Sequence, residues 1–76
     1  MMMPLAMAQP GENLKLVALR GGQRMRKRLA DLGMTLDMPL RLVHANGHGP
    51  LIVAVKGTRL AIGRGMAHHI MVEPVS

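Results

Sequence analysis

The chain has 76 residues, 49% of them hydrophobic, and a formal net charge of +6 from ten Lys and Arg against four Asp and Glu. This length permits one small domain, for which we take residues 1–76, and the low charged fraction of 18% argues against disorder. There is no Cys, Phe, Tyr or Trp. These absences exclude thiolate zinc fingers, iron–sulfur clusters and modules that stack bases or proline-rich peptides on aromatic rings.

The N-terminal part predicts a short lead-in followed by a strand. Residues 1–4 are expected to be a disordered N-terminus, and residues 5–8 fit a single helical turn before the turn signal Pro10-Gly11. Residues 13–19 alternate between apolar and other side chains, which predicts a strand. We expect its inward face to carry Leu14, Leu16 and Ala18.

One helix is predicted over residues 23–32. Met25, Leu29 and Leu32 follow one another at i, i+4 and i+7, so they share the face of an amphipathic helix. Gly33 stands where a left-handed residue commonly ends a helix.

The second half predicts closely spaced strands. Asn46-Gly47 is a strong hairpin signal, Lys56-Gly57 marks another turn, and Gly63-Arg64-Gly65 opens a short helical turn. The strands are expected at residues 39–45, 50–55, 58–62 and 70–74. Together with the first strand they predict an all-β domain with one short helix, bent into a small five-stranded barrel. The predicted core is Leu14, Leu16, Leu29, Leu32, Leu42, Val53, Leu60, Ile62, Ile70 and Val72.

The densest charge is the run Arg24-Met25-Arg26-Lys27-Arg28. On a helix, Arg24, Lys27 and Arg28 face away from the apolar residues and predict a patch that binds an anion or an acidic protein partner. The alternative is a solvated helix face with its cations near the C-terminus, where the helix dipole favours them. Nucleic acid is the weaker form of the binding hypothesis, because the chain offers no ring on which bases could stack.

Four histidines raise the question of a metal. His44 and His48 flank the Asn-Gly turn, so they could converge across a hairpin tip on zinc or ferrous iron. Adjacent His68 and His69 diverge too strongly to share one ion. The alternative is that all four are exposed loop histidines. No cofactor is required, and zinc or ferrous iron would be adventitious.

The sequence shows neither a catalytic motif nor a segment long enough to cross a membrane. The chain has no phosphate-cradling loop and no paired acid and base, so we expect no enzyme. The longest strongly apolar run, residues 51–55, is far shorter than a membrane-spanning helix needs. Without a basic leader we expect a cytoplasmic protein that reaches a membrane only through a partner.

Several segments, in this order and spacing, resemble the family of ferrous iron transport protein A (FeoA). They are Arg28-Leu29-Ala30-Asp31-Leu32-Gly33-Met34, the strand pair Val55-Lys56-Gly57-Thr58-Arg59-Leu60-Ala61-Ile62, and Ala67 followed by Ile70-Met71-Val72-Glu73. The resemblance covers residues 5–73. One departure is Leu36-Asp37, which stands where the family usually has Pro-Gly. Asp accepts a left-handed backbone better than most residues do.

The resemblance implies an SH3-like barrel and a non-enzymatic, cytosolic accessory role in bacterial ferrous iron uptake. Its partner would be the cytosolic G-domain region of the GTP-driven permease FeoB, and a weak homodimer is a further expectation. The surfaces we expect to bind the permease are the helix face of Arg24, Lys27 and Arg28, and the hairpin residues Gly47, His48 and Pro50. The alternatives are a nucleic-acid-binding small barrel and a small transition-metal-binding protein.

Overall fold

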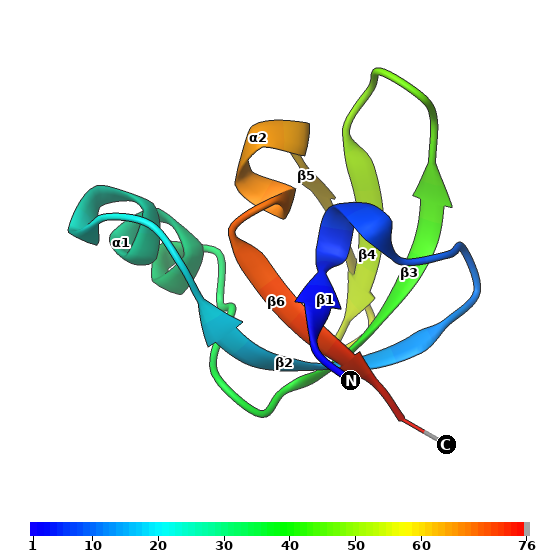
Figure 1. Cartoon of the computed structure of the whole chain (residues 1–76), viewed down its shortest axis with the longest axis horizontal. Helices are drawn as coiled ribbons and strands as arrows, with labels where there is room; N and C mark the ends of the chain where they lie inside the picture. Colours follow the sequence, from blue (N-terminus) through cyan, green and yellow to red (C-terminus); the bar gives the residue numbers. More distant parts are fainter. Residues whose placement is uncertain (76) are drawn as a thin grey trace.

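The computed structural model describes residues 1–75 and contains one antiparallel sheet that curls around an apolar core (Figure 1). Along the sheet the six strands run in the order β1-β6-β2-β3-β4-β5. The elements are β1 (Met3–Pro4), the 3₁₀ turn η1 (Leu5–Met7), β2 (Asn13–Leu19), α1 (Gln23–Asp31), β3 (Pro39–Ala45), β4 (Leu51–Val55), β5 (Thr58–Ile62), α2 (Arg64–Ala67) and β6 (Ile70–Pro74). The predicted all-β class with one short helix is confirmed, and α2 is the expected helical turn.

Two residues of the N-terminal segment, Met3 and Pro4, are part of the fold, contrary to the prediction of disorder for residues 1–4, whereas Met1 is fully exposed. Met3 pairs with Val72 and Pro4 with Met71, so β1 adds a sixth, two-residue strand to the five that were expected. The following residue, Leu5, is completely buried. Leu5 therefore anchors the N-terminal segment in the core. The composition of the N-terminus did not indicate this contact.

Two β-bulges reverse the side-chain alternation in the middle of two strands. In β2 the register shifts after Leu16, so Leu19 rather than Ala18 packs against the core. In β3 it shifts after Leu42, which leaves His44 exposed on the outer side. The predicted inward position of Ala18 is therefore wrong, because an extra residue in a strand shifts every later side chain to the other face.

The two hairpins differ in their turns. Lys56 and Gly57 both have positive φ, at 50° and 77°, and join β4 to β5 by the two-residue turn whose twist matches the strands. The Asn46-Gly47 pair also lies in a hairpin, but the connection from β3 to β4 runs over residues 46–50. Gly47 is not among the glycines with positive φ. This wider loop can offer backbone carbonyls to other parts of the molecule.

α1 ends one residue earlier than predicted, and this changes which side chain enters the core. The Gly33 N–H donates to the Ala30 carbonyl and the Met34 N–H to the Leu29 carbonyl, each at 2.9 Å, with Gly33 at φ 85°. This paired arrangement is a left-handed helix ending that turns the chain sharply. Met34 is consequently buried, whereas Leu32, predicted to lie in the core, is 39% exposed.

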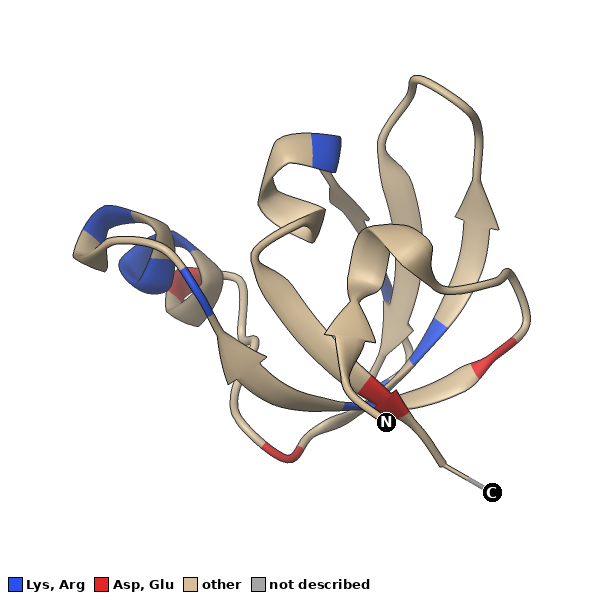
Figure 2. Cartoon of the chain, viewed as in Figure 1, with Lys and Arg blue, Asp and Glu red and all other residues tan. Residues whose placement is uncertain are grey.

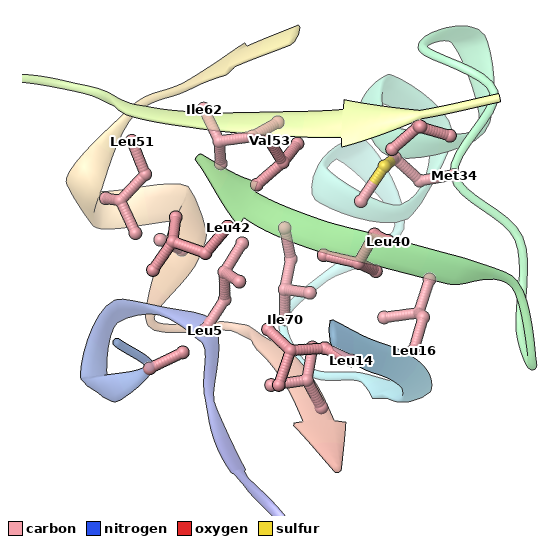
Figure 3. Close-up of a cluster of buried hydrophobic side chains, with 14 of the residues drawn as sticks. Leu5, Leu14, Leu16, Met34, Leu40, Leu42, Leu51, Val53, Ile62 and Ile70 are labelled. Atoms are coloured by element: carbon pink, nitrogen blue, oxygen red, sulfur yellow. The ribbon is translucent and has the colours of Figure 1, made fainter. Parts of the chain in front are cut away.

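The core contains aliphatic and methionine side chains from every strand except β1 (Figure 3). All predicted core residues are buried except Leu32 and Leu60, the latter half-buried and packed against the core. Residues that the prediction left out include Leu5, Met34, Leu40 and Leu51, which point into the same cluster (Figure 3).

Candidate partner-binding surfaces

The basic residues of α1 form an exposed cationic face. Lys and Arg gather on this helix more densely than elsewhere in the view of Figure 2. Arg24, Lys27 and Arg28 are all exposed, as predicted. The only buried residue of α1 is Leu29, so this one side chain and the half-buried Met25 attach the helix to the barrel.

Of the four cations of α1, two have a partner within residues 1–75 and two have none. The Arg26 guanidinium donates to the Leu19 carbonyl at 3.0 Å and holds the helix to the end of β2. Lys27 Nζ lies 3.5 Å from Asp31 Oδ2, with both side chains largely exposed, an ion pair worth about 0.3–0.5 kcal/mol. Within residues 1–75, Arg24 and Arg28 make no side-chain hydrogen bond or ion pair. Both remain available to a partner.

A groove lies beside these two free arginines. It has a volume of about 320 Å³ and is lined by Gly22, Arg24, Met25, Arg28 and Met66. Met25 and Met66 are half-buried, and Met66 comes from α2. The groove therefore joins the two helices, with methionine side chains beside two cations. Sequence reasoning missed it because Met66 is distant from α1 in the chain.

The loop between β3 and β4 is the second predicted surface, and Arg64 holds it in place. Arg64 Nε donates to the Gly49 carbonyl at 3.2 Å, and the same guanidinium donates to the Asn46 carbonyl. Within this loop Gly47, His48 and Pro50 are exposed. The sequence offered no signal for Arg64, because both of its acceptors are backbone atoms.

α2 connects the two predicted surfaces. Its Met66 lines the groove beside α1, and its Arg64 contacts the β3–β4 loop. In Figure 1 α2 lies between α1 and that loop. The helix face and the hairpin are therefore neighbours on either side of α2, a relation that the sequence did not reveal.

The two histidines proposed as metal ligands are both exposed. His44 lies on the outer side of β3 because of the bulge, and His48 lies in the loop. In the part of the chain that the structure describes, no three His, Asp or Glu side chains come together as a possible metal site. A site formed by His44 and His48 alone remains a prediction. His69 is half-buried, and its carbonyl accepts a hydrogen bond from the Arg20 N–H.

No polar or charged residue is buried among residues 1–75. The described helices are all too short to cross a bilayer.

Comparison with known proteins gives one consistent result. The model of the family described as "FeoA domain" matches residues 3–74. A protein of Methanocaldococcus jannaschii, provisionally named Fe(2+) transport protein A, is 39% identical over 72 residues, which are 95% of this chain and 87% of the relative.

Solved structures agree with the family model. A crystal structure of an iron uptake regulatory protein (FeoA) is 33% identical, with a TM-score of 0.92, and the match covers 99% of this chain and all of that one. A manganese-dependent transcriptional repressor is 21% identical with a TM-score of 0.90, over 97% of this chain and 42% of its own. The second likeness concerns the fold alone. The predicted SH3-like barrel is thereby confirmed.

Proposed function

The chain belongs to the FeoA domain family, and from this premise we propose that it is a non-enzymatic accessory protein of ferrous iron uptake. In this role it binds the cytosolic region of the GTP-driven permease FeoB and modulates that protein's activity. The observation that carries the proposal is the match of the family model over residues 3–74, together with the Fe(2+) transport name of the relative.

The surface of the molecule supports a binding role. α1 presents Arg24, Lys27 and Arg28 to solvent, and two of these three cations have no partner in the described chain. The electric field of such a cationic face raises the association rate of an acidic partner more than it raises the final affinity. We therefore assign the helix face to the first encounter with the permease, and the neighbouring β3–β4 loop to the same interface.

Co-purification with the cytosolic region of the permease tests the proposal. The wild-type chain is expected to be retained by that region and not by a structured RNA at the same salt concentration. Retention by RNA alone would replace the proposal with the nucleic-acid alternative, and retention by neither would remove the proposed partner.

A control variant distinguishes the effect of the α1 cations on permease binding from the effect of the net charge of the chain. Arg41 and Arg59 are exposed on β3 and β5, and both lie opposite Ala54 of β4. The double substitution Arg41→Glu with Arg59→Glu changes the charge by the same amount as a double reversal on α1. It is expected to retain binding to the permease region.

A further inference from the structure

We propose that the groove between α1 and α2 is a docking site for an acidic, apolar peptide segment of the partner. The occupant is a helix that presents two carboxylates one turn apart and a large apolar side chain on the same face. This inference rests on the proposed function, since it names the chemistry of the partner segment that this surface receives.

The two arginines of the groove determine the charge of the occupant. Arg24 and Arg28 are four residues apart on α1, so their Cα atoms are separated by about 6 Å along the helix axis. Neither has an intramolecular partner within residues 1–75, unlike Arg26 and Lys27 on the same helix. Two Glu or Asp side chains one turn apart on a second helix have the matching spacing and the opposite charge.

The two methionines determine the apolar part of the occupant. Met25 of α1 and Met66 of α2 contribute flexible thioether side chains to the lining, and such side chains adapt to ligands of different shape. The volume of about 320 Å³ is at the lower end of the range for ligand pockets. It therefore suits a single large side chain and is too small for an extended strand of nucleic acid.

A peptide fits this groove better than a lipid surface does. A bilayer needs a broad apolar face with a wide rim of cations, whereas the lining of this open groove is limited to two methionines, two arginines and Gly22. On α1, Arg26 donates to the Leu19 carbonyl and Lys27 pairs with Asp31, and the two cations of this helix that have no such partner within residues 1–75, Arg24 and Arg28, both line the groove.

The composition of the chain allows a direct test by nuclear magnetic resonance. Because the protein contains no Phe, Tyr or Trp, its only rings are those of four His, and a large ring-current shift of a methionine methyl group that appears only with added peptide reports the peptide's ring. The probe is a short helical peptide with two Glu one turn apart and one Phe on the same face. We expect it to shift the ε-methyl signals of Met25 and Met66, while those of the buried Met34 and Met38 stay unchanged.

Substitutions in the peptide and in the protein separate the two parts of the recognition. Replacing the Glu pair of the peptide by Lys is expected to abolish the methyl shifts, and replacing its Phe by Ser is expected to lower the affinity of the peptide, measured by calorimetry because the Ser peptide has no ring. Arg28→Gln in the protein is expected to lower the affinity for the original peptide about tenfold, because one charge-assisted contact is lost. Arg59→Gln removes the same charge from β5 and is expected to change the affinity less than twofold.

Four results would overturn the docking site. The first is that the peptide does not shift the methyl signals of Met25 and Met66, and the second is that Arg28→Gln and Arg59→Gln lose equal affinity for the peptide. The third is that anionic phosphatidylglycerol vesicles, and not the peptide, shift these signals. The fourth is that the signals shift with protein concentration alone. The last would assign the groove to a second copy of this chain. Co-purification with the permease region is a separate measurement. The docking site can therefore be disproved while binding to the permease is retained, and binding to the permease can be disproved while the groove still binds the peptide.

Discussion

Within residues 1–75, two residues other than glycine, Asp37 and Lys56, have a left-handed backbone, with φ of 68° and 50°. In Asp37 this conformation directs its N–H to the Leu16 carbonyl at 2.7 Å and connects the segment after α1 to β2. Asp37 thus has a left-handed backbone at the position where the family usually has Gly. An L side chain in this region costs of order 1 kcal/mol, partly relieved for Asp by its short polar side chain.

Replacing Asp37 by glycine should therefore stabilise the protein. We expect Asp37→Gly to raise the free energy of unfolding by roughly 0.5 kcal/mol, since the relief of strain exceeds the entropy that an added glycine costs. Urea denaturation measures the change. The matched control Leu36→Gly, at an exposed neighbouring residue without positive φ, should lower stability instead. A loss of stability in Asp37→Gly would show that the aspartate side chain matters more than the backbone conformation.

The histidine pair can be tested at the same scale. If His44 and His48 hold an ion together, calorimetric titration with zinc should give weak binding that disappears in both His44→Ala and His48→Ala. His68→Ala should bind zinc like the wild type. Zinc binding that survives both substitutions, or is absent from the wild type, would rule out the two-histidine site.

At the level of single residues, exposure and charge were readable from the sequence, whereas contacts between distant residues were not. Arg24, Lys27 and Arg28 are exposed because a helix with one apolar stripe must direct its cations outward. The role of Arg64 depends on carbonyls in a loop more than ten residues earlier. Backbone acceptors leave no pattern of residue types, so no sequence rule identifies that contact.

Among the elements, α1 is attached to the barrel mainly through Leu29. We expect Leu29→Ala to lower the free energy of unfolding by about 2–4 kcal/mol, because it removes a fully buried side chain from a small core. Leu32→Ala, three residues along the same helix end, should cost less than about 1 kcal/mol because that side chain is partly exposed. Equal losses for the two variants in denaturant titrations would contradict the position of the helix end.

The β3–β4 loop depends on Arg64 for its position. We expect Arg64→Ala to make the loop mobile, with backbone order parameters of Gly47 and His48 falling below about 0.6, while strand β4 stays rigid. Relaxation measurements on the labelled protein report this directly. Arg59→Ala is the control, because Arg59 is exposed and pairs with Ala54, near the end of β4 that lies away from the loop. An unchanged loop in Arg64→Ala would show that the two carbonyl contacts do not restrain it.

The strands could be predicted because apolar residues alternate along them, but their bulges could not. An inserted residue changes the register without changing the composition, so nothing in β2 or β3 signals the shift after Leu16 or Leu42. The end of α1 was misplaced by one residue for a related reason. The spacing of Met25, Leu29 and Leu32 fits a helix, yet the turn at Gly33 gives the inward position to Met34.

At the scale of the whole molecule, the excess of six positive charges is distributed unevenly. Arg24, Arg26, Lys27 and Arg28 concentrate charge on α1, at one side of the barrel (Figure 2). The composition indicated a small barrel and an anionic partner, but not how the surfaces meet. Their juxtaposition across α2 depends on the closure of the sheet, which brings residues 24–28, 46–50 and 64–67 together.

The most direct test of the account is the rate at which the chain associates with the cytosolic region of the permease, measured by surface plasmon resonance. Arg24→Glu with Lys27→Glu should leave the fold intact, because both side chains are exposed, and should slow association far more than Arg41→Glu with Arg59→Glu. The wild-type rate should also fall as salt shortens the Debye length from ~30 to ~10 Å. If the folded α1 variant associates at the wild-type rate at low salt, the basic face of α1 does not bind the permease.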